Sequence, residues 1–189
     1  MNVREDEVES SPKKLLIGIT GFLETEARPS GVETILFKCL TDVDNLLISR
    51  YNWREPIRTL SNFVDRVCNE WYGVEVSIIG YSYGAQSAVN LIKHLCPMPI
   101  KNLFLIDPVY RPHHYLPSVF SIYGFGTLYV ESTVERCHVW RQKISAIRGC
   151  TVVRLGDDTN LYEDTLAWRH TKIDNSPAIQ GTIIERMQA

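Results

Sequence analysis

The residues best suited to do chemistry stand in the segment Gly80-Tyr81-Ser82-Tyr83-Gly84, which matches the pattern G-x-S-x-G. In a nucleophile elbow, the central serine of this pattern sits on a sharp, strained turn between a strand and a helix, with its hydroxyl exposed above the sheet. The helix N-terminus behind it favours negative charge. A β-rich run, 74–79, precedes the serine and a helix-favouring run, 85–95, follows it. The pattern therefore predicts a nucleophilic serine, against the alternative of an ordinary turn with a surface serine.

A serine hydroxyl is a weak nucleophile at neutral pH, and it needs a base, usually a histidine that a carboxylate orients. The sequence contains five histidines. His170 lies between the last predicted strand and the last predicted helix, where a base on a loop belongs. We therefore rank His170 first as the base for Ser82, with a surface loop histidine as the alternative.

The other four histidines are less suited to act as the base. His94 lies about three turns along the helix that follows the elbow, too far away to reach the serine. His138 falls inside a helix that we expect over 133–147. His113 and His114 could reach the site from a loop. They could also resemble a metal-binding pair, but no further ligand stands at a recognisable spacing, so we expect no metal site.

Two acids compete to orient the base. Asp107 ends an apolar strand abruptly, at the edge of the sheet where the elbow lies, although an Asp-Pro pair is also a common turn former. Asp157, or its neighbour Asp158, follows a later strand and also precedes His170. We favour Asp107 because a carboxylate at the end of a buried strand is held rigidly, and Asp157 stays open as the alternative.

Acyl-transfer chemistry also needs backbone N–H groups that stabilise an oxyanion. One is expected from Tyr83, the residue after the nucleophile, and the other from Phe22 in the turn after the first strand. Gly18 and Gly21 near that turn could indicate dinucleotide binding. The pattern G-x-G-x-x-G is absent, however, and no acidic residue ends the second strand, so we reject that interpretation.

The elements that must position these groups alternate along the chain. Apolar runs predict strands over 15–20, 45–51, 74–79, 102–106 and 151–155. Helices are expected between them, one opening at a Ser30–Glu33 capping box and one over 133–147 at a Ser132–Glu135 capping box. The alternation predicts an α/β three-layer sandwich with a mainly parallel sheet of about five strands and right-handed crossovers.

Between Pro108 and Glu131 the alternation is interrupted by a stretch rich in proline and aromatic residues. We expect this excursion, 108–131, to be a lid or a wall of the substrate pocket, or a segment that its aromatic side chains simply pack down. The polar segment 1–13 is expected to be a mobile tail, and 14–189 a single domain.

Composition limits the classes of function. The formal net charge of −2 gives no electrostatic reason to bind nucleic acid or an anionic membrane. No apolar run approaches the length of a membrane span, and the N-terminus lacks the apolar core of a signal peptide. The five cysteines are scattered and odd in number. Reduced thiols in a cytoplasmic protein are therefore expected, rather than disulfides or a zinc site.

With these motifs placed, the chain from about Lys14 onward resembles the α/β-hydrolase superfamily. The elbow, the Gly21-Phe22 turn and the late His170 carry the resemblance, and the family's first two strands are missing. The chain looks like a minimal member of about cutinase size, similar to short bacterial and phage-type serine hydrolases. In those proteins a segment like Ile106-Asp107-Pro108-Val109 supplies the acid, so the resemblance favours Asp107. One departure is Thr20 before Gly21, where many relatives have histidine.

Together, the motifs and the resemblance predict a serine hydrolase that cleaves carboxylic esters or thioesters through Ser82, His170 and Asp107. The substrate would be a small molecule, and no cofactor would be required. A non-catalytic binding module that retains the fold is the alternative, and an acyltransferase with the same triad is a third possibility. The sequence leaves the acyl group, the leaving group and the oligomeric state open.

Overall fold

The computed structural model describes residues 13–22, 24, 30–111 and 125–189. Its centre is a six-stranded sheet with the order β2-β1-β3-β4-β6-β8, in which every neighbouring pair is parallel. The strands are β1 (Lys14–Thr20), β2 (Leu46–Asn52), β3 (Glu75–Tyr81), β4 (Ile100–Ile106), β6 (Val134–Gln142) and β8 (Asn160–Leu166). The predicted α/β fold class is confirmed, with six strands in the sheet instead of about five.

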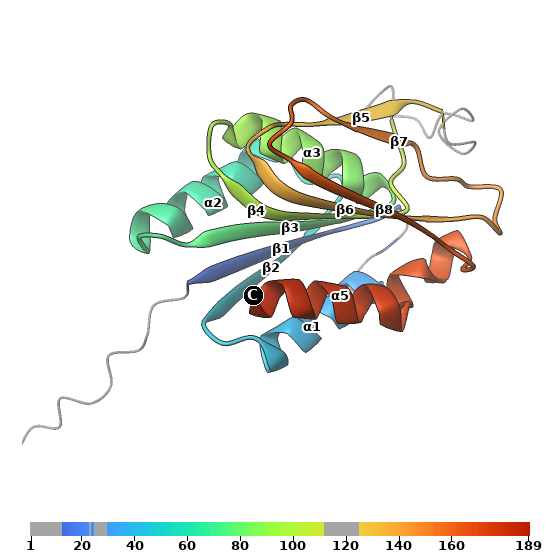
Figure 1. The fold of residues 1–189 in the computed structure, drawn as a ribbon. Helices are drawn as coiled ribbons and strands as arrows, with labels where there is room; N and C mark the ends of the chain where they lie inside the picture. Colours follow the sequence, from blue (N-terminus) through green and yellow to red (C-terminus); the bar gives the residue numbers. More distant parts are fainter. Residues whose placement is uncertain (1–12, 23, 25–29, 112–124) are drawn as a thin grey trace, which may run out of the picture.

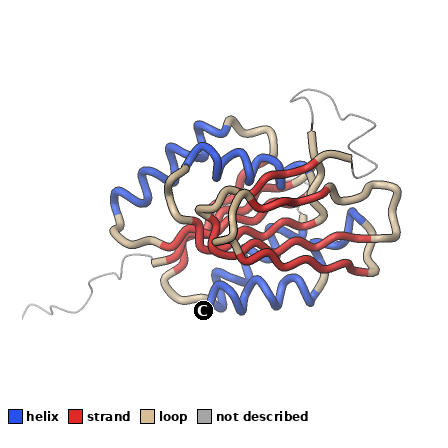
Figure 2. The backbone as a smooth tube through the Cα atoms, turned by 45° about the horizontal axis from the view of Figure 1, so that its top comes forward, coloured by secondary structure: helices blue, strands red, loops and turns tan. Residues whose placement is uncertain are grey.

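Helices cover both faces of this sheet (Figures 1 and 2). One face carries α1 (Gly31–Asp42) and α5 (Pro177–Gln188). A short 3-10 helix, η1 (His170–Asn175), lies between β8 and α5 in the chain. The other face carries α2 (Ile57–Glu70) and α3 (Tyr83–Leu95). Above α3 in Figure 1 lies a second, two-stranded parallel sheet of β5 (Thr127–Val130) and β7 (Thr151–Arg154). These layers make the sandwich that the alternating sequence predicts.

The central strands are apolar along their whole length because both of their faces are buried. On β1, Leu16 packs into the core on the side of α1 and α5, whereas Leu15 and Ile17 pack on the side of α2 and α3. On β3, Ile79 and Ile78 divide between the two cores in the same way. All five side chains are completely buried, and each contributes about 1.5–3 kcal/mol by leaving water.

Helix α1 begins at the capping box that the sequence predicts. The N–H of Val32 donates to Ser30 Oγ at 3.1 Å, and the N–H of Ser30 donates to Glu33 Oε2 at 2.7 Å. The other oxygen of Glu33 pairs with Arg50 at 2.9 Å, which ties the start of α1 to β2. Leu40 lies on the outer face of this helix, where 49% of its surface is exposed.

The prediction of a helix over 133–147 is wrong, because most of this segment forms β6, which lies between β4 and β8. The pattern at Ser132 and Glu135 imitates a capping box, but Glu135 instead pairs with Lys101 across β4 and β6 at 3.0 Å. A strand at this position completes the ladder of β4 and buries Cys137 and Val139. Tertiary pairing therefore overrides the local helix signal.

The C-terminal half of the sheet also departs from the prediction. The expected strand 151–155 exists as β7, but it pairs with β5 instead of joining the main sheet. The last strand of the main sheet is β8, in a region expected to be a loop. The connections β4–β6 and β6–β8 thus pass through two strands of a small sheet. Within the excursion 108–131, β5 is regular structure, and 112–124 lie outside the described residues.

The carboxyl ends of β1, β3, β4 and β6 meet along one edge of the sheet. Ile19 pairs with Gly80, Tyr81 with Ile106, and Ile106 with Trp140, so these strands end at nearly the same level. After β1 the chain continues to β2 on one side and then to β3 on the other. Such a topological switch point leaves a crevice at the carboxyl edge, the usual place for a site in this class of sheet.

Candidate active site

Ser82 stands on the turn between β3 and α3, with φ 53° and ψ −118°. A serine rarely adopts a positive φ, and such strain persists only where the surroundings hold it. Here the N–H of Ser82 donates to the carbonyl of Ile106 at 3.0 Å, and the Ser82 carbonyl accepts from the N–H of Val109 at 3.0 Å. The backbone around β4 therefore fixes the elbow.

Two glycines let the strand and helix approach this closely. A Cβ on Gly84 would stand 2.2 Å from the carbonyl oxygen of Ile19, and one on Gly80 would stand 2.6 Å from the Cα of Ala85. Both distances are shorter than any real contact of a Cβ atom. The G-x-S-x-G pattern is thus a steric requirement of this turn, as the sequence predicts.

The structure brings the side chains of Ser82, His170 and Asp107 into one hydrogen-bonded chain. Ser82 Oγ lies 2.9 Å from Nε2 of His170, and Nδ1 of the same ring lies 2.5 Å from Oδ2 of Asp107. The three residues are 5%, 7% and 0% exposed, respectively. The second carboxylate oxygen of Asp107 accepts from the N–H of Gln142 at 3.4 Å. Burial from water strengthens each of these interactions.

The backbone of His170 is held on both sides. Tyr81 donates its hydroxyl proton to the carbonyl of His170 at 2.5 Å, and the N–H of His170 donates to Ser145 Oγ at 2.8 Å. The rings of Tyr81 and His170 are also stacked, with centres 5.6 Å apart. Tyr81 precedes the elbow serine, so the same strand end positions Ser82 and the histidine. Sequence reasoning missed the roles of Tyr81 and Ser145.

The predicted oxyanion donors lie next to the elbow. Tyr83 is the first residue of α3, where a backbone N–H has no partner within the helix. The Phe22 ring packs edge-on against that of Tyr83, with centres 5.5 Å apart, so the turn after β1 reaches the elbow. The N–H of Gly21 is already engaged, because it donates to Glu24 Oε2 at 2.6 Å. That the N–H groups of Phe22 and Tyr83 together form an oxyanion hole stays a prediction.

The competing acid lies elsewhere. Asp157 is fully exposed and pairs with Arg154 at 3.4 Å. The ring nitrogens of His170 are instead hydrogen-bonded to Ser82 and Asp107. Asp158 is also exposed and lines a hollow beside the other ends of the strands, near Glu75 and Lys101. The geometry therefore connects only one of the candidate acids, Asp107, to the histidine.

The remaining histidines that the structure describes stand apart from Ser82. His94 is exposed on the last turn of α3. His138 is buried in β6, where its ring stacks on Tyr162 and Trp140 with centres 4.6 and 5.7 Å away. Burial lowers the pKa of His138 to about 4, so the ring is neutral at physiological pH. His113 and His114 lie outside the described residues.

Two further acids, the half-buried Glu24 and the buried Asp174, lie near the first turn of α1. Burial raises the pKa of Glu24 to about 8 and that of Asp174 to about 6, and the two carboxylates repel each other. Oδ2 of Asp174 accepts from the N–H of Gly31 at 2.6 Å, which fastens η1 to the start of α1. No single-sequence signal identifies Glu24, because its surroundings are formed only by the fold.

The described part of the chain offers no group of three or more His, Cys, Asp or Glu side chains that could hold a metal ion. In the same residues, every helix is too short or too polar to cross a membrane. All five cysteines are free thiols.

No protein-family model matches the sequence, and the comparison with curated proteins gives no match. Solved structures do match the fold. A cutinase-like protein from Cryptococcus sp. is 14% identical, with 96% of this chain and 98% of that chain covered and a TM-score of 0.53. An esterase domain from a Rhodothermus marinus protein is 11% identical (94% and 85% covered, TM-score 0.55). The thioesterase domain SrfTE, which cyclizes surfactin, is 9% identical (94% and 93%, TM-score 0.54). The chain has the α/β-hydrolase fold.

Proposed function

We propose that the protein is a serine hydrolase that cleaves carboxylic esters or thioesters of a small-molecule substrate. One observation carries this proposal: the hydrogen-bonded chain of Ser82, His170 and Asp107 at the carboxyl edge of the sheet. Each member has the chemistry that its position demands, namely a nucleophile, a base and a carboxylate that orients the base. The matched structures include an esterase domain and a thioesterase domain, which supports the same class of chemistry.

In the proposed reaction, Ser82 Oγ attacks the substrate carbonyl carbon while Nε2 of His170 takes the hydroxyl proton. Asp107 accepts the hydrogen bond of the Nδ1–H group, so it fixes the tautomer that leaves Nε2 free and then stabilises the imidazolium. The N–H groups of Tyr83 and Phe22 would stabilise the oxyanion of the tetrahedral intermediate.

The intermediate collapses when His170 gives its proton to the leaving alcohol or thiol, and the acyl group stays on Ser82. Water then attacks the acyl-enzyme, and the same nitrogen accepts a proton from this water. Release of the carboxylic acid returns the proton to the serine oxygen. These residues supply every proton transfer, so the mechanism needs no cofactor.

A fluorophosphonate probe, which reacts with activated serines, tests the proposal directly. Wild type should be labelled on Ser82, as located by mass spectrometry, whereas Ser82→Ala should not be labelled. Ser132→Ala, which changes an exposed serine, serves as the matched control and should label normally. An unlabelled wild type that folds and melts cooperatively would argue against a hydrolase and favour a binding module with this fold.

A further inference from the structure

Arg111 is a buried cation close to the candidate active site. Only 8% of its surface is exposed, although Arg111 lies in the loop that follows β4. Its guanidinium carbon lies 4.7 Å from the centre of the Trp53 ring and 5.7 Å from that of Tyr83. Nη2 donates to Ser87 Oγ at 3.0 Å, and the buried Nε has no hydrogen-bond partner among the residues that the structure describes. A guanidinium has five N–H donors, and the described residues accept from few of them.

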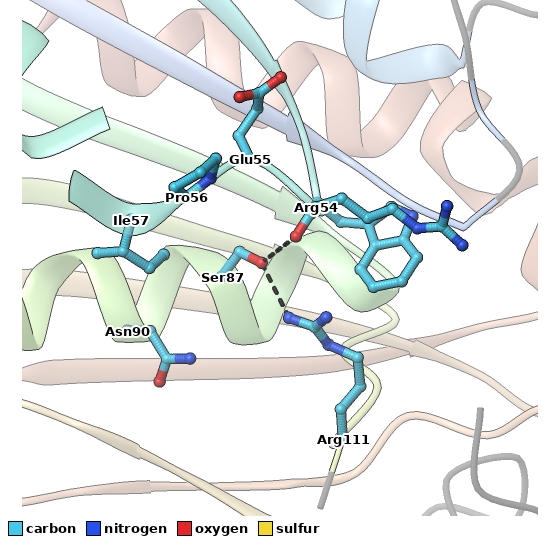
Figure 3. Close-up of a pocket in the computed structure, with 8 residues that line it drawn as sticks. Arg54, Glu55, Pro56, Ile57, Ser87, Asn90 and Arg111 are labelled. Carbon is cyan, nitrogen blue, oxygen red and sulfur yellow. Dashed lines mark hydrogen bonds between the residues drawn. The ribbon is translucent and has the colours of Figure 1, made fainter. Parts of the chain in front are cut away.

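Within the described residues, no carboxylate lies within ion-pair distance of Arg111. The adjoining segment 112–124 contains no aspartate or glutamate. Among the described residues that line the same cavity, Glu55 is the one acid, and Figure 3 shows its carboxylate directed away from the guanidinium. A buried charge without a partner is costly, and arginine does not lose its proton in proteins. An anion from outside the protein would supply the missing partner.

The guanidinium faces a cavity large enough to admit such an anion. The cavity has a volume of about 660 Å³, and its lining includes Trp53, Ser87, Asn90 and Arg111. Figure 3 shows Ser87 and Asn90 next to each other along α3, with the guanidinium of Arg111 near Ser87. Bidentate binding of carboxylate and phosphate is what guanidinium geometry favours. The amide of Asn90 could add a further donor.

The cavity lies at a distance from Ser82 that a small substrate can span. Ser87 follows Ser82 by five residues, which is about 7.5 Å along the axis of α3 at the usual rise per residue. Covalent bonds of about 1.5 Å cover that distance in about six zigzag steps. Tyr83, the predicted oxyanion donor, contacts Arg111 itself. One substrate could therefore meet both groups.

This inference rests on the proposed hydrolase function. We propose that Arg111 binds an anionic group of the substrate, a carboxylate or a phosphate, about six bonds from the scissile carbonyl carbon. The enzyme is then selective for acidic esters or thioesters, and Arg111 is its specificity-determining residue.

Three p-nitrophenyl esters of equal chain length test this proposal. They are the hydrogen adipate, which ends in a carboxylate, the 5-phosphonopentanoate, which ends in a phosphonate, and the neutral adipamate. Wild type should cleave at least one of the two acidic esters with kcat/KM about 10- to 100-fold above that for the amide, as expected of hydrogen bonds to a charged group. The better acidic ester identifies the kind of anion.

Arg111→Gln should bring the ratio of acidic to neutral kcat/KM close to one, whereas Arg111→Lys should keep part of it. Arg58→Gln, which changes an exposed arginine on α2, is the matched control and should keep the full ratio. If Arg111→Gln does not fold, wild type still gives a test, because free adipate should inhibit it at least tenfold more tightly than neutral adipamide, and equal inhibition by the two would overturn the anion site.

Equal cleavage of all three esters by wild type, abolished in Ser82→Ala, would overturn the role of Arg111 and leave the hydrolase intact. If wild type cleaves none of the esters, the hydrolase proposal fails by itself. Calorimetric titration with adipate then decides the anion site separately. Binding that weakens at least tenfold in Arg111→Gln would support the site, and absent or unchanged binding would overturn it.

Discussion

Replacing Asp107 by asparagine removes the charge of this side chain and hardly changes its size. The carboxylate is completely buried, its Oδ2 lies 2.5 Å from Nδ1 of His170, and its Oδ1 accepts from the N–H of Gln142. The amide oxygen of asparagine can serve only one of these two donors. Because the peptide N–H of Gln142 cannot change its role, the amide NH₂ would face the histidine.

The expected loss of activity follows from the histidine tautomer. A donor next to Nδ1 requires a lone pair on that nitrogen, so the ring proton moves to Nε2, 2.9 Å from Ser82 Oγ. In that tautomer His170 cannot accept the serine proton. The variant also lacks the negative charge that stabilises the imidazolium. The two effects together should lower kcat/KM about 10³- to 10⁴-fold, or about 4–5.5 kcal/mol of transition-state stabilisation.

The assay is hydrolysis of a p-nitrophenyl ester from pH 6 to 9, with a melting curve for each variant. Asp157→Asn makes the same chemical change at the fully exposed competing acid, so its kcat/KM should stay within twofold of wild type. Asp107→Asn should melt cooperatively. If it keeps more than a tenth of wild-type activity, Asp107 does not orient the base. A large loss in Asp157→Asn would point to a different arrangement of the site.

Gly84→Ala should abolish activity and lower the melting temperature, because its Cβ would stand 2.2 Å from the Ile19 carbonyl oxygen; a stable, active variant would contradict this packing. Gly149→Ala should lower kcat about 10- to 100-fold in a folded protein, since its Cβ would stand 2.8 Å from Oδ1 of Asp107 and displace the carboxylate; unchanged turnover would mean that the carboxylate tolerates the shift. Burial raises the pKa of Glu24 from 4.5 to about 8, so the folded state holds this proton more tightly than the unfolded state. The free energy of unfolding should therefore fall by several kcal/mol, and by at most about 5 kcal/mol, as the pH rises through this range, and urea titrations of Glu24→Gln should lack that part of the fall; identical pH profiles would refute the assignment.

The elbow and its partners are the part of the fold that the sequence predicts best. Gly80 and Gly84 are needed because β3 and α3 touch there and leave no room for a Cβ atom. This steric requirement can be recognised from the motif in one sequence. Asp107 and His170 could be placed because parallel strands gather their carboxyl ends at one edge. The structure brings these side chains together, and their catalytic roles stay a prediction.

The C-terminal half was harder to predict because its local signals conflict with its pairing. Ser132 and Glu135 have the spacing of a capping box, yet the segment gains more by completing the ladder beside β4. β8 is an edge strand with mostly exposed or half-exposed residues, so it lacks the apolar run that marks a central strand. The environment of Arg111 depends on Trp53 and Ser87, which come from distant parts of the chain. No periodicity in the sequence could reveal that contact.

The hydrogen bonds between Ser82 and the residues that flank Asp107 also bear on the order in which the site is assembled. Ser82 and Asp107 belong to one unit, because the backbone of Ser82 is hydrogen-bonded to the carbonyl of Ile106 and the N–H of Val109. His170 belongs to the last segment of the chain, which docks through α1 and α5. During synthesis, Ser82 and Asp107 can therefore be in place before His170 leaves the ribosome. If the protein is the proposed hydrolase, a growing chain should show no activity toward esters until its C-terminal helix has docked.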